Sequence, residues 1–323
     1  MRFFSIALAA TALLAAAHAH AQDASFPDKS KTMTMIIPNS AGGGTDIAGR
    51  MLAEGLKQKL GLAVIVENLS GAGGIEGATR LQSAAPDGYT IALVPVPQVS
   101  MYYLDPERGG DFKRENTVVI AQHDYGALAI AVAKDSKFQK LQDVVDAAKA
   151  SPGTITSASS TVLSTGHLSL LRLNKVAGIE LNWTAMEQAG TALASLLGGH
   201  LDIITDTYSE LYPHAKSGDI RLLAVFDTER QPSLPDVPTA QEQGFDVVMT
   251  TTRLVIAPKD TPGPVVKTIE TAIQELINDA DYQAQAKERS VNIRFRASAD
   301  AAKVWEDIDT NFGPIVKEFR ENN

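Results

Sequence analysis

The sequence predicts an α/β protein with two lobes, each built around a mainly parallel sheet, and three observations support this class. Short β-rich runs alternate with segments whose apolar residues recur at helical spacing. Turns that contain glycine or proline separate the two kinds of segment. The chain has 323 residues, of which 44% are hydrophobic, so it can build one large core or two of moderate size. Such alternation is typical of parallel sheets covered by helices on both faces.

The rhythm of strand and helix is regular from the first elements onward. Ile47, Met51, Leu52, Leu56 and Leu60 recur at helical spacing after an apolar, extended run, which predicts a strand followed by an amphipathic helix. The predicted strands are 34–37, 63–66, 89–94, 117–122, 128–133, 154–157, 180–183, 201–205, 220–225 and 254–257. The predicted helices are 47–60, 75–83, 141–150, 166–176, 192–197, 208–215, 264–278 and 299–319.

Two stretches interrupt this rhythm. Residues 105–116 are rich in charge and glycine, and residues 228–238 are polar and rich in proline, as in a surface connection. The number of α/β units favours two lobes with a cleft between them, which is a common place for a small ligand. We expect one lobe to comprise residues 22–122 and 226–323, and the other to comprise residues 123–225.

The first 21 residues have the features of a secretory signal peptide. A positively charged start at Arg2 precedes an apolar run, and Ala19-His20-Ala21 fits a small-x-small cleavage site. The apolar run is shorter than the roughly 20 residues that a membrane-spanning helix needs. The sequence therefore predicts an exported protein that begins at Gln22 after cleavage, outside the cytoplasm.

Composition excludes several classes of function. The chain has no cysteine, which excludes disulfides and thiolate metal sites. Loss of Arg2 with the signal peptide changes the net charge from −9 to −10, so no nucleic-acid partner is expected. The sequence has no P-loop, and its histidines lack the spacing of a zinc site, so neither a cofactor nor a metal is expected. An anionic ligand would need a local positive feature.

Three consecutive glycines, Gly42 to Gly44, could supply that feature between the first predicted strand and helix. The first amides of a helix lack intrahelical partners, and the helix dipole adds partial positive charge there. Glycines let an anion approach these amides without meeting a side chain. Such a site binds carboxylate or phosphate without lysine or arginine. Alternatively, Thr45 or Asp46 merely caps the helix, and these residues alone leave both interpretations open.

An exported serine hydrolase is an alternative function. Ser164 is close in sequence to His167, and Asp206 lies at the end of a predicted strand, where open α/β sheets bind ligands. However, no serine has the Gly-x-Ser-x-Gly elbow, and proximity in sequence does not make a triad. His167 could equally cap or pack at the start of its helix.

Seven stretches of the sequence, taken together and in order, suggest a family. They are IIPNSAGGGTDIAGRMLAEGL, VIVENLSGAGGIEGA, AAPDGYTIAL, ASLLGGHLDIITD, SGDIRLLAV, LPDVPTAQEQGF and APKDTPGPVV. With them the chain resembles the periplasmic receptors of tripartite tricarboxylate transporters, also called the Bug family, over nearly all of its mature length.

The resemblance implies a two-lobed receptor without catalysis, which binds a small organic carboxylate and delivers it to integral-membrane permease subunits. The ligand-binding residues that it implies in the first lobe are Ser40, Ala41, Gly42, Gly43, Thr45, Asp46 and Pro97. Those that it implies in the second lobe are Ser160, Thr161, Ser164, His167 and Asp206. A sensory module that presents its ligand to a membrane kinase is a further alternative.

The sequence departs from the family pattern in the second lobe. Thr161 and Leu163 stand in the loop SSTVLSTGHL where the family commonly has glycines, and residues 186–188, Met-Glu-Gln, replace a common Tyr-Lys-Gly. We expect these changes to make the second-lobe half of the pocket bulkier and to favour an apolar or aromatic acid.

Overall fold

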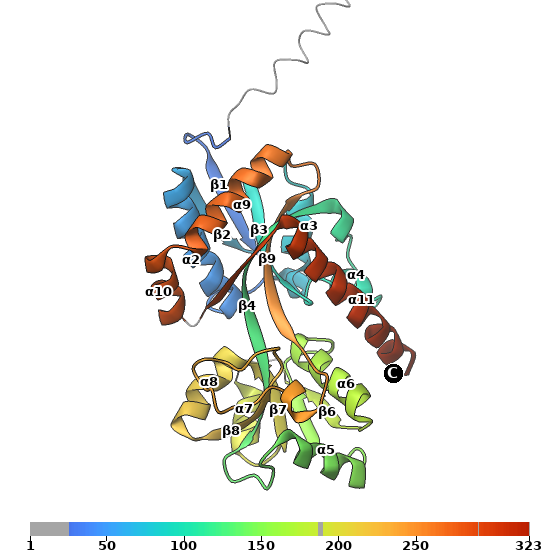
Figure 1. Cartoon of the computed structure of the whole chain (residues 1–323). Coiled ribbons are helices and arrows are strands. Elements are labelled where there is room, and N and C mark those ends of the chain that lie inside the picture. Colours follow the sequence, from blue (N-terminus) through green and yellow to red (C-terminus); the bar gives the residue numbers. More distant parts are fainter. Residues whose placement is uncertain (1–25, 187–189, 290, 323) are drawn as a thin grey trace, which may run out of the picture.

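The computed structural model describes residues 26–186, 190–289 and 291–322, which form two lobes connected by long strands (Figure 1). The predicted signal peptide, residues 1–21, lies outside the described residues. The first lobe contains β1 (Thr32–Ile37), α2 (Gly44–Leu60), β2 (Ala63–Asn68), α3 (Ile75–Gln82), β3 (Thr90–Val96), α4 (Met101–Leu104), α9 (Gly263–Ile277), α10 (Ala280–Glu288) and β10 (Asn292–Ala297). The second contains α5 (Leu141–Ala150), β5 (Thr156–Ser159), α6 (Thr165–Ala177), β6 (Asn182–Ala185), α7 (Thr191–Leu197), β7 (Ile203–Thr207), α8 (Tyr208–Ser217) and β8 (Ile220–Val225). Three elements reach both lobes: β4 (Thr117–Ala133), β9 (Thr250–Pro258) and α11 (Ser298–Asn322).

The two-lobed α/β class predicted from the sequence is confirmed, but each sheet is mixed rather than mainly parallel. The parallel pairs join β1 to β2 and β3 in the first lobe, and β5 to β6 and β7 in the second. The long strands β4 and β9 are antiparallel to each other and to their other neighbours. One strand carries the chain into the second lobe and the other brings it back, so they run in opposite directions and cannot pair in parallel.

The strand β4 corrects one prediction. Residues 117–122 and 128–133, expected as two strands, are the two ends of a single strand. The polar and glycine-containing stretch between them suggested a break, yet Asp124 pairs with Arg253 and Gly126 with Thr251 in the ladder with β9. The first half of β4 completes the sheet of the first lobe, and the second half pairs with β7 and β8 of the second.

Alternating side chains bury both faces of the first sheet. Met33 and Met35 of β1 pack in one cluster with Leu52 of α2, whereas Ile36 packs in another with Trp305 of α11. Successive residues of a strand point to opposite faces, so one short strand supplies both cores. Full burial of such side chains stabilises the fold by about 1.5–3 kcal/mol each.

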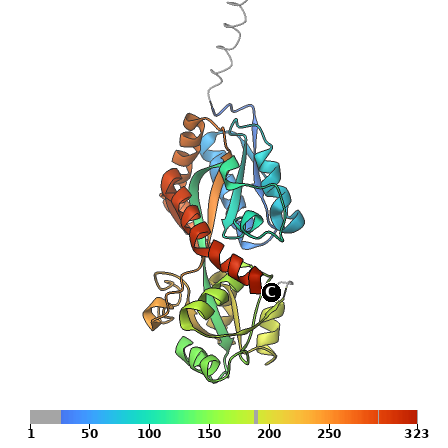
Figure 2. The ribbon, with the colours of Figure 1, turned by 90° about the vertical axis from the view of Figure 1, so that its right-hand side faces the viewer.

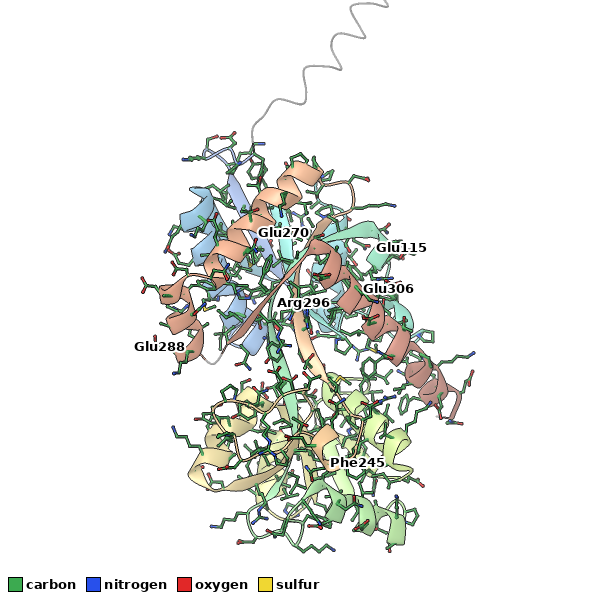
Figure 3. The ribbon with its side chains drawn as sticks, in the orientation of Figure 1. Glu115, Phe245, Glu270, Glu288, Arg296 and Glu306 are labelled. Atoms are coloured by element: carbon green, nitrogen blue, oxygen red, sulfur yellow. The ribbon has the colours of Figure 1, made fainter. Side chains whose placement is uncertain are left out.

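The end of α11 packs against the second lobe. Phe312, Ile315 and Val316 belong to the same cluster as Leu168 and Leu173 of α6, and Figure 2 shows α11 running down from the first lobe to the boundary with the second. Side chains from the connection before β9 join this cluster too, including Phe245, which lies in the lower lobe in Figure 3. The backbone between β8 and β9 therefore contributes to the second core before it returns.

The sequence analysis missed three elements: α4, α10 and β10. The helix α10 has the sequence ADYQAQAKE and buries only Tyr282 and Ala286, so its apolar periodicity is weak. All six residues of β10 are partly buried, and they therefore lack the alternation that marks a half-buried strand. The elements α10 and β10 are short and polar, and tertiary contacts hold them in place. Such contacts leave no local pattern in the sequence.

Candidate functional site

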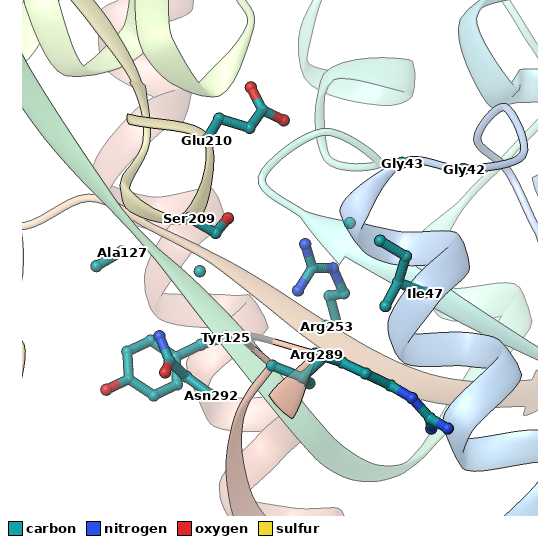
Figure 4. A pocket seen from close by; sticks show the side chains of 13 residues that line it. Gly42, Gly43, Ile47, Tyr125, Ala127, Ser209, Glu210, Arg253, Arg289 and Asn292 are labelled. Atoms are coloured by element: carbon teal, nitrogen blue, oxygen red, sulfur yellow. The ribbon is translucent and has the colours of Figure 1, made fainter. Parts of the chain in front are cut away.

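A cavity of about 220 Å³ lies between the lobes, beside the long strands (Figure 4). The first lobe contributes the glycine turn with the start of α2 and the segment before β10. The second lobe contributes the start of α8, and β4 and β9 form the wall between them. The lining residues are Gly42, Gly43, Gly44, Ile47, Tyr125, Gly126, Ala127, Ser209, Glu210, Arg253, Arg289, Val291 and Asn292.

The glycine turn faces this cavity, and its conformation is held by Asp46. The carboxylate of Asp46 accepts hydrogen bonds from the backbone N–H of Gly42 at 2.8 Å, from Nε of Arg50 at 3.0 Å and from Nδ2 of Asn68 at 3.0 Å. Burial alone would raise the pKa of Asp46, but these hydrogen bonds outweigh burial and lower it. Gly42 has φ +85°, a conformation that favours glycine. Asp46, predicted to contact the ligand, thus shapes the turn from behind.

The start of α2 exposes its first amides to the cavity. Gly43 and Gly44 are exposed, and no side chain caps the helix. The first amides of a helix lack intrahelical acceptors, and the helix dipole adds positive charge there. The position of this turn in the interlobe cavity agrees with the anion-binding interpretation, whereas a purely capping role for Thr45 or Asp46 does not account for it.

Arg253 of β9 adds a positive side chain that the sequence analysis did not anticipate. The residue is 9% exposed, and its guanidinium donates from Nε to Oγ1 of Thr45 at 3.1 Å and forms an ion pair through Nη1 with Asp124. A Cβ on Gly44 would lie 2.9 Å from Nη2, so the guanidinium sits directly beside the glycine turn. The sequence analysis expected backbone amides without arginine at this turn, and the structure places one arginine beside them. The sequence did contain a signal for Arg253: a charged residue directly before the apolar run 254–257 is expected to be buried and paired.

A buried chain of hydrogen bonds holds Arg253 in place. Asp124 is fully buried, and its other oxygen lies 2.8 Å from Nδ1 of His123, whose Nε2 is 2.7 Å from the hydroxyl of Tyr282. Burial would raise the pKa of Asp124, but the positive charge of Arg253 and the hydrogen bond from His123 lower it. The carboxylate therefore stays ionised and orients the guanidinium toward the cavity.

The second-lobe wall is acidic. Glu210 and Ser209 belong to the first turn of α8, and Asp206 lies near the end of β7, as the sequence predicted. Burial and the neighbouring carboxyl of Glu210 raise the pKa of Asp206 to about 8. The cavity therefore has a cationic first-lobe wall and an acidic second-lobe wall.

Comparisons with known proteins identify the architecture. Residues 48–320 match the family described as "Tripartite tricarboxylate transporter family receptor". The chain belongs to this family. A Cupriavidus necator relative of this receptor, described as "UPF0065 protein in gbd 5'region", is 34% identical over 280 residues, covering 86% of this chain and 84% of the relative.

Solved structures agree with this assignment. A TctC solute-binding protein from Polaromonas superposes on this receptor with a TM-score of 0.79 at 25% identity, and the match covers 91% of this chain and 99% of that one. MatC from Rhodopseudomonas palustris, solved with bound malate, superposes with a TM-score of 0.74 at 23% identity, covering 88% and 98% of the two chains. The resemblance inferred from the sequence is thus confirmed, and the chain is a solute-binding receptor of this type.

Several predicted ligand contacts of the receptor lie away from the cavity lining. Gly42 and Gly43 line it, Thr45 accepts from Arg253, and Asp206 lies next to the lining residue Glu210. The others are not among the lining residues of the described chain. Ser40 and Ala41 are exposed beside the turn, Pro97 is buried after β3, and Ser160, Thr161, Ser164 and His167 lie at or before the start of α6.

The loop before α6 explains one departure from the family pattern. Leu163 has φ +54°, in the left-handed region that favours glycine, the residue that the resemblance implies at this position. Its side chain is 1% exposed within the second-lobe core, and Val162 accepts a hydrogen bond through its carbonyl from Nη2 of Arg108 at 2.8 Å. Leu163 therefore fills the core rather than the pocket, contrary to expectation. Residues 187–189 lie outside the described residues.

The geometry around His167 opposes the serine-hydrolase alternative. Its ring stacks on Trp183 at 3.6 Å between centroids, and its Nδ1 accepts from the backbone N–H of Leu163 at 3.0 Å. Ser164 caps α6 by accepting from the backbone N–H of His167 at 3.3 Å. Among the described residues, neither Ser164 nor Asp206 forms a hydrogen bond with the imidazole. The histidine packs at the helix start, which was the second interpretation of the sequence.

Two further findings concern metals and membranes. No three His, Asp or Glu side chains of the described residues come close enough together to hold a metal ion. Within the same ranges, none of the helices has both the length and the apolar character of a membrane span.

Replacing Asp206 with asparagine is expected to stabilise the receptor by about 2 kcal/mol at pH 8. The pKa of Asp206 is raised on folding, so the wild type loses stability as the pH rises from about 4 to about 8. Asparagine does not ionise and keeps an oxygen for the backbone N–H of Thr207, now 2.7 Å away. Chemical denaturation at pH 5 and pH 8 measures the effect, with the exposed Asp236→Asn as control. Equal stabilities of wild type and Asp206→Asn at pH 8 would contradict it.

Proposed function

We propose that this protein captures a small organic carboxylate in the interlobe cavity and delivers it to a tripartite tricarboxylate-type permease. The observation that carries the proposal is the pairing of Arg253 with the open start of α2. A guanidinium and helix amides act on the same anion, and both are pre-oriented by buried groups. A pre-organised pocket loses little entropy when the ligand binds.

Lobe closure is the proposed mechanism. The ligand first binds the first-lobe wall and then recruits Ser209 and Glu210 of the second, which shifts the equilibrium toward the closed form. The hinge lies in β4 and β9. We place residues 226–249 and the end of α11 with the second lobe, because they share its core. The first lobe then comprises the mature N-terminal segment to residue 122 together with β9 to the middle of α11.

Export through a cleaved signal peptide at residues 1–21 and residence in the periplasm are part of this proposal. No catalytic step is assigned, since the Ser164, His167 and Asp206 side chains are engaged in capping, stacking and a carboxyl pair. A bound acid should be recovered chemically unchanged after prolonged incubation, which NMR of the released ligand measures.

Replacing Gly44 with valine tests the binding site. The new Cβ meets Nη2 of Arg253 at 2.9 Å, and losing a charge-assisted hydrogen bond costs about 1.5–3 kcal/mol, or at least about tenfold in affinity. Calorimetry over a panel of small mono-, di- and tricarboxylates and amino acids measures it. Gly263→Val is the matched control, because Gly263 is also the first residue of its helix and its Cβ would meet open space.

The outcomes separate clearly. Binding of at least one carboxylate by wild type and Gly263→Val, with loss in Gly44→Val at unchanged circular dichroism, supports the proposal. If no acid of the panel binds wild type, or if Gly44→Val keeps full affinity, the proposed carboxylate site is wrong.

A further inference from the structure

The two walls of the cavity carry opposite charge, so the two ends of a bound ligand meet different electrostatic surroundings. Arg253 and the start of α2 lie on the first-lobe side, and Glu210 lies on the second-lobe side (Figure 4). The hydrogen bonds of Arg253 to described residues use Nε and Nη1, which leaves Nη2 of this nine-tenths buried side chain directed at the cavity. One end of the ligand therefore has an anion site.

Glu210 lacks a cationic partner in the described part of the chain. Among those residues no lysine, arginine or histidine forms an ion pair with it, although it lines the cavity with Ser209. Its carboxyl instead lies against that of Asp206, whose pKa is raised by burial and by Glu210, so the two carboxyls present negative charge with no cation beside them. This charge faces whatever part of the ligand reaches α8.

The remaining cation of the lining does not offset this charge. Arg289 is exposed, and Figure 4 shows its side chain extending along the first-lobe wall away from Glu210. Because its guanidinium points away from α8, and no ion pair joins it to Glu210 among the described residues, Arg289 does not compensate the carboxyl of Glu210. If the ligand had a second carboxylate, that group would lie against the carboxyls of Asp206 and Glu210. Like charges without a compensating cation are unfavourable in a closed site.

We propose that the ligand is a carboxylate whose far end carries a protonated amine. Its carboxylate binds Arg253 and the start of α2, and its ammonium group donates to Glu210. This inference rests on the proposed function and specifies the class of ligand for the same cavity. Glu210 acts as the residue that selects the cationic end and rejects a second carboxylate.

The position of Glu210 also links the choice of ligand to the closure of the two lobes. The anion site belongs to the first lobe and Glu210 to the second, so a ligand with both charges joins the lobes, whereas a simple acid holds only one of them. The ammonium end therefore contributes most in the closed form. Small-angle scattering should show a smaller radius of gyration with the amino acid than with the uncharged-tail acid at saturation.

A set of ligands with equal chain length tests the proposal. 4-Aminobutyrate, glutarate and pentanoate share a carboxylate and three methylenes and end in ammonium, carboxylate and methyl, and the series is repeated with two, four and five methylenes. Calorimetry on the full mature protein should give the amino acid about tenfold or more tighter binding than either partner of the same length. Glu210→Gln should remove that advantage and strengthen dicarboxylate binding about tenfold.

The control variant is Glu115→Gln, which changes the net charge equally at an exposed site away from the cavity, where the described residues show no ion pair (Figure 3). It should keep the wild-type preference. Tighter binding of a dicarboxylate or a simple acid by wild type, or an unchanged preference in Glu210→Gln, overturns the inference and leaves the receptor function standing. Absence of binding by every acid in both panels would instead remove the proposed function itself.

Discussion

Replacing Arg253 with methionine is expected to lower the free energy of unfolding by about 3–5 kcal/mol and to weaken carboxylate binding by about 100-fold or more. The substitution removes the cation from the cavity wall and leaves Asp124 as a buried carboxylate beside His123. Breaking a buried ion pair from one side is costly because the other charge has no water to replace its partner. Denaturant unfolding and calorimetry measure the two effects.

A double variant separates the two consequences. Arg253→Met with Asp124→Asn carries no uncompensated charge, and the introduced asparagine keeps an acceptor for His123, so most of the lost stability should return. Carboxylate binding should not return, because the guanidinium is still missing. Arg172→Met, which removes a surface ion pair with Asp246, should change stability by less than about 1 kcal/mol and leave binding intact. Recovery of binding in the double variant would contradict the role of Arg253.

Acidification from pH 6.5 to pH 4 is expected to reduce the stability of the protein by about 3 kcal/mol through His167 alone. Burial, helped by the positive charge of Arg320, lowers the pKa of His167 from 6.5 to about 4. Below pH 6.5 the unfolded chain binds a proton at this residue and the folded chain does not, so the unfolded state gains stability. Above pH 6.5 both states are neutral, and the residue makes no pH-dependent contribution.

The variant His167→Asn isolates this effect. Asparagine can accept from the backbone N–H of Leu163 but does not titrate in this range, so its stability should fall less steeply than that of wild type between pH 6.5 and pH 4. The exposed His200→Asn should keep the wild-type slope. Parallel pH profiles for wild type and His167→Asn would mean that the histidine is not held neutral in the folded protein.

Much of the fold followed from local patterns. The helix from 141 to 150 and the strand from 220 to 225 have the predicted bounds, because the helix repeats its apolar residues at helical spacing and the strand is a short, largely apolar run that starts after a glycine turn. The glycine turn was found for the same kind of reason, since a strand, three glycines and a helix define a backbone feature within a few residues. The number of α/β units already favoured two lobes, and the family resemblance added the class of receptor.

The other half of the site could not be predicted in this way. Arg253 meets Thr45 across 208 residues of sequence and its other partner Asp124 across 129, and no local pattern reports such a pairing. Likewise, Glu210 was assigned only to a helix, and its place in the cavity depends on how the second lobe faces the first. Pro97 and Ser160 were carried over from the family by position, although neither lines the cavity.

The amino-acid sequence on its own determined the order of most strands and helices, the signal peptide that we expect and the glycine turn, because each depends on residues that are neighbours in sequence. Tertiary structure alone decides that β4 is continuous through both lobes, that His167 is sealed between Trp183 and Phe319, and that Arg253 faces an acidic wall. Burial and charge pairing depend on distances between remote segments, and these distances exist only once both lobes have folded and the long strands have joined them.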